Sequence, residues 1–516
     1  MSKSLLKSSG VVSLLTLLSR LLGFVREIML ATAFGAGAAM DAFLVALMIP
    51  NFGRRMFAEG AFSQAFVPVF TEVKTTGTHD EARDMVAVVM GTLGGVLSLV
   101  TVIGCLGAPV LVWLFASGFT ADPAQNALGT ELLRWTFPYL MFISLTSMAG
   151  GVLNAYGKFA VPAFTPVILN VCLISTAFID ANSVQVLAYA VFVAGILQFA
   201  FQLPLLLRLR LLPRPRWAWG DGRVRRILRL MIPVMIGSSV AQISLLLNTN
   251  LSTHIGNGSV SWLYYANRLM EFPLGIFSIA VGTAILPALS AQHAKKTPEA
   301  FSSTLDWSLR VILLIGLPAA VGMILLAGPL VSTVYGHGAF SAEDVRMTTY
   351  ALWAYGAGFM GFSFVKVLVP GFYARQETRI PVRYAITSLV IGMALSLSLF
   401  TVSKFYAFDA AHVGLAASTS LTACINGGLL FWRLRRDGIY RAEPGWGLFW
   451  LRLIAANLLM GAAVLWLAGD LAGWLAAGEW ARGGRMLLLV GAAMAVYFAV
   501  LAASGLRVRH FRAVRR

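Results

Sequence analysis

Long runs of apolar residues constrain this chain more than any other feature. A helix needs about 20 predominantly apolar residues to cross the hydrocarbon core of a bilayer. The 516 residues contain fourteen such stretches, at 10–34, 38–72 (interrupted near Pro50), 85–115, 131–155, 162–179, 184–207, 230–253, 261–289, 306–335, 346–371, 381–403, 410–432, 446–469 and 485–506. The runs are continuous rather than alternating, which favours helices over membrane strands. The sequence therefore predicts an all-α polytopic membrane protein with fourteen transmembrane helices, and excludes a soluble enzyme.

The charge composition supports this interpretation and predicts an orientation. Hydrophobic residues make up 58% of the chain and charged residues 12%, about half the charged fraction of a typical soluble domain. The formal net charge of +18 would suggest nucleic acid binding in a soluble protein, but cytoplasmic loops of membrane proteins also collect Lys and Arg. With the N-terminus inside, 27 of the 40 basic residues fall in inside loops and three, Lys404, Arg482 and Arg485, in outside loops. We therefore expect both termini to be cytoplasmic.

Several local patterns return after about 215–220 residues. Gly60–Ser63 returns as Gly275–Ser278, and Trp135 as Trp353. The turns at 118–122 and 156–162 return at 338–344 and 373–381. These patterns predict two duplicated six-helix lobes, 1–222 and 223–440, around a central cavity, followed by two further helices and a basic tail in 441–516. Parallel repeats of this kind are typical of transporters, and a duplicated scaffold or lipid receptor is the alternative.

Charged residues lie inside three of the predicted spans. A central Arg costs roughly 2.5–3.5 kcal/mol even on the lenient insertion scale, so these side chains should face a hydrated cavity or one another. The spacings of Arg55 with Glu59 and of Arg268 with Glu271 also allow local ion pairs. Arginines exceed acids slightly in these spans, and guanidinium groups bind phosphate oxygens in pairs. The pattern therefore indicates an anionic, phosphate-bearing substrate. The residues concerned are Arg20 and Arg26 in the first span, Asp41, Asn51, Arg54, Arg55 and Glu59 in the second, and Arg268 and Glu271 in the eighth. We also expect Pro50 and Gly53 to open the second span, which would free backbone groups to line the cavity.

The same residues carry a family resemblance. SRLLGFVRE (19–27), MDAFLVALMIPNFGRRMFAEGAFSQAFVPVF (40–70), SWLYYANRLMEFPLGIF (261–277) and PGFYARQETRIPV (370–382) closely resemble the MurJ (MviN) family of bacterial lipid II flippases. The family belongs to the multidrug/oligosaccharidyl-lipid/polysaccharide exporter superfamily. The resemblance implies translocation of the lipid-linked peptidoglycan precursor from the inner to the outer leaflet of the cytoplasmic membrane by alternating access. It also implies a groove for the polyprenyl tail in 441–516.

The resemblance assigns roles to residues at matching positions. It places Arg20, Arg26, Asp41 and Arg268 in the substrate-binding cavity. It places Asn51, Arg54, Arg55, Glu59 and Glu271 at a gate near the inside face. Relatives commonly have Ala-Asp-Arg where this chain has Ala266-Asn267-Arg268, so a gate pair here must use Glu271.

The expected partners are lipid II, membrane lipids and other cell-wall synthesis proteins. The seventh, eleventh and twelfth spans contain no Asp or Glu, so we expect no sodium site there, and no metal or cofactor. Two other transport functions remain open: a drug/cation antiporter, which the arginine excess disfavours, and a flippase for another polyprenyl-diphosphate-linked oligosaccharide, which only the motifs disfavour. The sequence shows no nucleophile–base set, so an enzyme is not expected.

Overall fold

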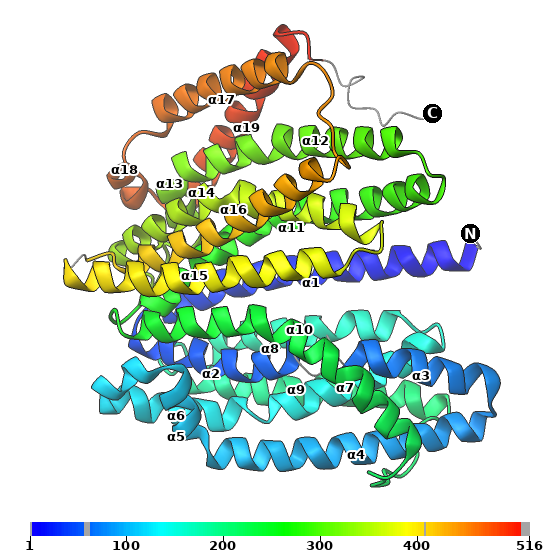
Figure 1. Ribbon diagram of the computed structural model, residues 1–516. Coiled ribbons are helices and arrows are strands. Elements are labelled where there is room, and N and C mark those ends of the chain that lie inside the picture. The colour runs from blue at the N-terminus through cyan, green and yellow to red at the C-terminus, as the bar shows by residue number, and fades with distance from the viewer. Residues whose placement is uncertain (1–2, 56–61, 407–408, 507–516) are drawn as a thin grey trace. The chain divides into compact units, whose positions relative to one another are not determined.

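The computed structural model describes residues 3–55, 62–406 and 409–506 and is helical throughout (Figure 1). No β-strand occurs in those ranges. Continuous helices satisfy every backbone hydrogen bond within the segment, which a chain must do where no water is present. The all-α class predicted from the apolar runs is confirmed.

Ten helical segments in the described part of the chain are long and apolar enough to cross a membrane: α4, the continuous pair α6–α7, α8, α9, α12, α14, α15, α16, α17 and α19. The other four predicted spans coincide with helices α1, α2, α10 and α11. Three of these four helices carry the charged residues singled out in the sequence. The protein is therefore a multi-pass membrane protein, and the count of fourteen spans stays a prediction.

The chain divides into two compact units, Met1–Ser261 and Trp262–Arg516. The first unit has an apolar core between α3, α4, α7 and the first turns of α10, with Phe66, Phe70 and Met85 fully buried. The boundary lies inside α11, 39 residues after the predicted lobe boundary at 222, because α10 packs on helices of the first unit. The helices of this unit are α1 (Lys3–Phe34), α2 (Ala38–Arg54), α3 (Ser63–Thr76), α4 (His79–Leu106), α5 (Ala108–Phe115), the short η2 (Ser117–Ala121), α6 (Pro123–Thr136), α7 (Tyr139–Ala155), α8 (Ala160–Ile179), α9 (Gln185–Arg208) and α10 (Gly222–Thr253).

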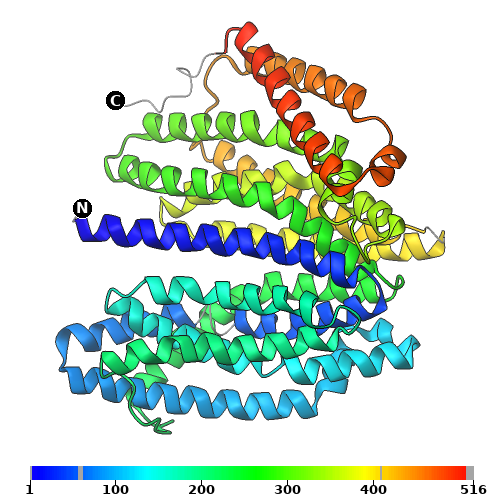
Figure 2. The ribbon, with the colours of Figure 1, turned by 180° about the vertical axis from the view of Figure 1, so that it is seen from behind.

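The second unit has two apolar clusters that share α12. One cluster joins α12 to α14 and α16, and the other joins it to α17 and α19. Helices α17 and α19 lie side by side in both ribbon views (Figures 1 and 2). The C-terminal pair is thus packed onto this unit through α12. The helices are α11 (Ser259–Ala294), α12 (Pro298–Leu325), α13 (Ala327–Val334), α14 (Ala342–Tyr373), α15 (Arg379–Phe405), α16 (His412–Arg436), α17 (Trp446–Ala468), α18 (Leu471–Ala476) and α19 (Glu479–Ala503).

Helix order and length repeat along the chain. Helices α1, α4, α5 and α8 begin 219 residues before α10, α12, α13 and α15 respectively. The first three pairs also match in length, at 32, 28 and 8 residues. This offset agrees with the 215–220-residue spacing of the sequence patterns. The division into lobes at 222 and 440 stays a prediction.

Side-chain caps start corresponding helices. The carboxylate of Asp122 accepts hydrogen bonds from the first backbone N–H groups of α6. Ser341 and Asp344 form a reciprocal capping box at the start of α14. Such caps satisfy N–H groups that have no partner inside the helix. The two caps lie 219 residues apart, in the turns 118–122 and 338–344 that the sequence patterns matched.

The second span differs locally from the prediction, since α2 continues through Pro50 to Arg54. Proline lacks the N–H that would bond the carbonyl four residues earlier, here that of Ala46. The hydroxyl of Thr136 on α6 donates to this carbonyl at 2.7 Å and satisfies it. Gly53 lies against the terminal methyl groups of Leu140, which would have to shift to admit a larger side chain. The expectation that Pro50 and Gly53 open the helix is therefore wrong.

Two buried charged side chains attach the C-terminal helices to the second unit. Asp306 of α12 accepts hydrogen bonds from Tyr440, Trp446, Arg310 and the backbone of Glu443 at 2.7–3.2 Å. Arg482 of α19 is only 9% exposed and donates to four backbone carbonyls, among them those of Ser332 and Gly336 at the end of α13. A cation suits a helix C-terminus because the carbonyls there carry partial negative charge. Arg482, an exception to the predicted charge asymmetry, therefore has a structural use.

We predict that Thr136→Val destabilises the protein by about 1–3 kcal/mol, because the Ala46 carbonyl is left buried without a donor. Thermal unfolding of the purified protein in detergent should show a lower Tm. In a Pro50→Ala background the restored N–H reaches this carbonyl, so the same substitution should cost much less. An equal loss in both backgrounds would contradict the pairing.

Candidate functional site

A polar cluster holds one of the predicted site arginines on α1. The Nη1 atom of Arg26 donates to Oδ1 of Asn170 on α8 at 3.0 Å, and its Nη2 forms an ion pair with Glu27. The Nδ2 atom of Asn170 donates to the backbone carbonyl of Ser19 at 3.0 Å. Asn170 and Glu27 are 5% and 3% exposed. The cluster fixes the guanidinium of Arg26 and clamps α1 against α8.

Arg20 differs from Arg26 in its surroundings. Its side chain is exposed, and no hydrogen bond or ion pair reaches it from the described residues. The two arginines lie six positions apart on the helix, so their side chains leave α1 about 120° apart. Gly23 lies between them, against the amide of Asn170. Of the two arginines, Arg20 has the guanidinium available to an added ligand.

Asp41 on α2 is fully enclosed and contacts none of the predicted arginines. One carboxylate oxygen accepts from the backbone N–H of Gly258 at 2.7 Å. The other accepts from the backbone N–H and the hydroxyl of Ser261, the N–H at 2.8 Å. These donors belong to the first turn of α11, whose N–H groups have no partner within the helix. Asp41 therefore acts as an N-terminal cap that α2 supplies to α11, with favourable charge at the positive end of the helix.

The described gate residues make local contacts at the end of α2. The Nε atom of Arg54 donates to Oδ1 of Asn51 at 3.0 Å. The Nη1 atom of Arg55 lies 3.4 Å from Oε1 of Gln242 on α10, at the limit of a hydrogen bond. The predicted partner Glu59 lies outside the described residues. Asn51 and Arg54 are thus brought together within one helical turn.

Arg268 and Glu271 form the local ion pair that their spacing allows. Nη1 of Arg268 lies 2.9 Å from Oε2 of Glu271, and the guanidinium lies 5.0 Å from the ring centroid of Tyr264. Both charged side chains are partly exposed, at 36% and 48%. An exposed pair of this type contributes little to stability, so both groups can exchange this contact for another at small cost.

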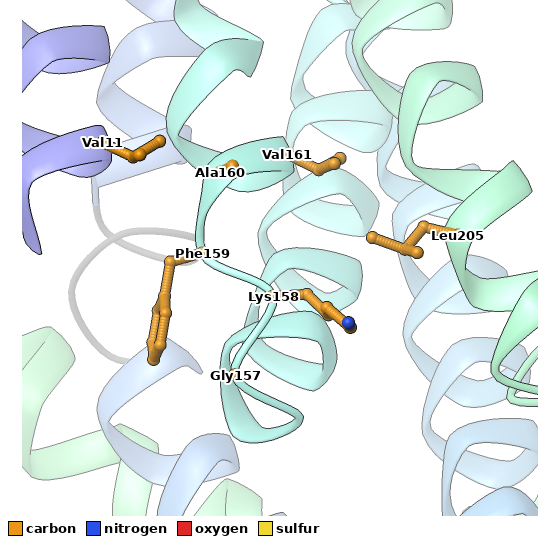
Figure 3. A pocket seen from close by; sticks show the side chains of 7 residues that line it. All are labelled: Val11, Gly157, Lys158, Phe159, Ala160, Val161 and Leu205. Atoms are coloured by element: carbon orange, nitrogen blue, oxygen red, sulfur yellow. The ribbon is translucent and has the colours of Figure 1, made fainter. Parts of the chain in front are cut away.

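A pocket of about 260 Å³ lies between α1, α8 and α9 in the first unit. Figure 3 shows Val11 of α1 and Leu205 of α9 on either side of the turn that carries Lys158 and Phe159. The amine of Lys158 points to the Leu205 side (Figure 3). None of the predicted site residues lines this pocket.

Asn170 and Gln242 were not expected from the sequence. Asn170 lies 144 residues from Arg26, and Gln242 lies 187 residues from Arg55. A lone amide in an apolar run gives no indication of its partner. The available signal was only that each is a strong hydrogen-bonding group inside a predicted span, where polar groups need partners.

Long apolar helices that carry paired arginines, acids and amides define a polytopic membrane transporter rather than an enzyme. The family model described as "Lipid II flippase MurJ" matches residues 30–481. A Vibrio cholerae protein named "Probable lipid II flippase MurJ" is 43% identical, over 99% of this chain and 98% of its own. A Burkholderia cenocepacia protein named "Lipid II flippase MurJ" is 40% identical, over 99% of each chain. The chain belongs to the MurJ family of lipid II flippases.

Solved structures agree with this fold. A structure of a lipid II flippase MurJ in an inward closed conformation matches with a TM-score of 0.79 at 24% identity, over 95% of this chain and 98% of that one. An inward-facing multidrug resistance transporter of the MATE family matches with a TM-score of 0.62 at 14% identity, over 81% and 94%. At these identities the likeness concerns the fold alone.

We predict that Asp41→Asn and Ser261→Ala both destabilise the protein, by about 2 and 1 kcal/mol respectively. The asparagine turns an amide N–H₂ towards one of the donors of α11, whereas the alanine removes a single hydroxyl. Thermal unfolding in detergent measures both shifts. Asp80→Asn, at an exposed position in the first turn of α4, is the matched control and should change Tm little. If Asp41→Asn behaves like this control, the cap is unimportant for stability.

Proposed function

We propose that this protein is a lipid II flippase that moves the lipid-linked peptidoglycan precursor from the inner to the outer leaflet by alternating access. Membership of the family over nearly the whole chain carries this proposal. Relatives at 40–43% identity bear that name. The exposed guanidinium of Arg20 within a membrane helix supports it, because an intramembrane arginine is costly and is typically retained for substrate.

In this mechanism Arg20, Arg26 and Arg268 bind the diphosphate of the headgroup. Guanidinium groups suit this role because their N–H groups match pairs of phosphate oxygens. Arg26 enters the step already oriented by Asn170 and Glu27. Arg268 has its exposed partner Glu271 to exchange for phosphate. Asp41 supports the site indirectly by fixing the start of α11, the helix that carries Arg268.

The gate comprises Asn51, Arg54, Arg55, Glu59 and Glu271. The contact of Arg54 with Asn51 and that of Arg55 with Gln242 hold the end of α2. Both contacts are weak enough to exchange during a cycle, since exposed polar pairs are worth about 1 kcal/mol or less. Closure at this end separates the headgroup from the inside solution.

The C-terminal segment 441–516, which follows the lobes 1–222 and 223–440 along the chain, forms the groove for the polyprenyl tail. Helices α17 and α19 expose large apolar side chains, including Leu458, Leu465, Leu487 and Leu488, which suit a hydrocarbon chain. Both termini are cytoplasmic in this arrangement, as the basic loops require. The partners are lipid II, membrane lipids and other proteins of cell-wall synthesis.

A flippase for another polyprenyl-diphosphate-linked oligosaccharide would use the same diphosphate contacts. The two functions differ in the consequence of losing the protein. Depletion in the source organism should cause lysis with accumulation of lipid II. Loss of a surface polysaccharide without lysis would favour the alternative.

We predict that Arg20→Ala reduces lipid II exposure at the outer leaflet by about 10- to 100-fold, the value of one or two charge-assisted hydrogen bonds to phosphate. Arg20→Lys should retain part of the activity because it keeps the charge. The protein level and Tm should stay at wild-type values because Arg20 is exposed. Arg83→Ala, at an exposed position on α4, is the control and should flip normally. Wild-type exposure rates in Arg20→Ala would refute the role of Arg20.

We predict that Asn170→Asp impairs flipping more than Asn170→Ser. The carboxylate neutralises Arg26 and cannot donate to the carbonyl of Ser19, whereas serine keeps a small neutral hydroxyl. The measurement is lipid II exposure in reconstituted vesicles, with Tm measured in parallel. Equal activity of the two variants at equal Tm would show that the charge on Arg26 is not used.

A further inference from the structure

The segment that connects α9 to α10, residues 209–221 (the strap), lies along α4 in the first unit (Figures 1 and 2). The backbone N–H of Arg216 donates to the carbonyl of Ala87 at 2.9 Å, and that of Ala218 donates to the hydroxyl of Thr92 at 3.1 Å. Gly91 and Gly95 provide the groove, because a methyl group at either position would collide with the strap. The strap is therefore fitted to this helix.

Ion pairs fix the middle and the C-terminal end of the strap. The two carboxylate oxygens of Asp84 on α4 each lie 2.7 Å from a guanidinium, one of Arg216 and the other of Arg223. Arg223 also pairs with Asp221 at 2.7 Å. The hydrogen bond from Arg223 holds the pKa of the Asp221 carboxyl below its usual value, so this carboxyl is ionised at neutral pH. These ion pairs hold the strap and the start of α10 together on α4.

A cavity of about 170 Å³ lies between α4, α10 and the strap. Its walls are almost entirely apolar and include Val89, Leu93 and Val96 of α4, Ile227 and Leu228 of α10, and Trp219 of the strap. Apolar cavities of this size stay dry and accept hydrocarbon. The shape of this site suits one end of a lipid chain.

Basic and aromatic residues adjoin the cavity lining along the chain, since Arg225 and Arg229 follow the lining residues Val224 and Leu228 and Trp217 lies two positions before Trp219. Arg225 and Arg229 are exposed on the first turns of α10, and neither has an ion pair within the described part of the chain. Trp217 and Trp219 are 59% and 49% exposed and stack with ring centroids 6.1 Å apart. Tryptophan prefers the membrane–water interface, and clustered Lys and Arg there attract anionic lipid headgroups.

We propose that this cavity holds an acyl chain of an anionic phospholipid whose phosphate binds Arg225 and Arg229. The predicted orientation places the strap on the cytoplasmic side, where such lipids carry the negative surface potential. The bound lipid fills the space between α4 and α10 and so stabilises the attachment of α10 to the first unit. This site is separate from the arginines of α1 and does not depend on the substrate proposed above.

Native mass spectrometry of the full chain in detergent tests the site, with phosphatidylglycerol and phosphatidylcholine as probes. Wild-type protein should retain phosphatidylglycerol preferentially. The double variant Arg225→Ala/Arg229→Ala should bind it about tenfold more weakly, since each basic residue near a membrane surface adds a few-fold to affinity. Arg379→Ala/Arg383→Ala removes the same charges at the same spacing from exposed positions on α15, and should bind as wild type does.

Val96→Trp fills the cavity and should weaken retention of both lipids. If Val96→Trp fails to fold, the Arg225→Ala/Arg229→Ala variant still tests the proposal, because both arginines are exposed and their removal should not affect folding. Three results would each overturn the proposal. The wild-type protein could retain both lipids equally, the Arg225→Ala/Arg229→Ala variant could bind phosphatidylglycerol as wild type does, or the α15 control could lose as much binding as that variant. Displacement of phosphatidylglycerol by equimolar undecaprenyl diphosphate would overturn it too, by assigning the site to the transported lipid.

Discussion

The cost of a polar group without a partner in hydrocarbon determines most of the local structure of this protein. Water is absent from the bilayer core, so a backbone carbonyl freed by a proline must find a donor on another helix. The Ala46 carbonyl finds the hydroxyl of Thr136. The same requirement holds for Glu27, which pairs with Arg26, and for Asp41, which accepts hydrogen bonds from Gly258 and Ser261. Helix contacts are therefore specified at polar positions, while apolar side chains fill the remaining space.

This constraint separates the arginines into two groups with different uses. Several of those in predicted inside loops are paired at the surface, such as Arg216 in the strap and Arg223 at the start of α10, which both pair with Asp84. Arg26 and Arg268 lie within predicted membrane helices, and each has a carboxylate next to it. Arg20 is the exposed member of this second group. A positive charge inside a predicted span with no hydrogen-bond or ion-pair partner among the described residues is costly, and we propose that a substrate anion offsets that cost.

The sequence could predict the helices because apolar length is a local property. It also predicted the pair Arg268–Glu271, since residues three apart on a helix are neighbours. Partners on different helices could not be predicted. Asp41 meets Ser261 after 220 residues and Arg26 meets Asn170 after 144, and helical periodicity says nothing about which faces meet. The expected opening at Pro50 was wrong for the same reason, because Thr136 compensates from a distant helix.

Position 170 carries an amide rather than a carboxylate, and the phosphate-binding role proposed for Arg26 accounts for this difference. An acid there would orient the guanidinium equally well, but together with Glu27 it would leave a net negative site. It would also lose the N–H that binds the carbonyl of Ser19. Asparagine accepts from Arg26 and donates to α1 at once, so it orients the arginine without cancelling its charge. We therefore propose that residues 19–27 form a prearranged cationic segment, in which Arg26 is already oriented and Arg20 remains exposed to bind the anion.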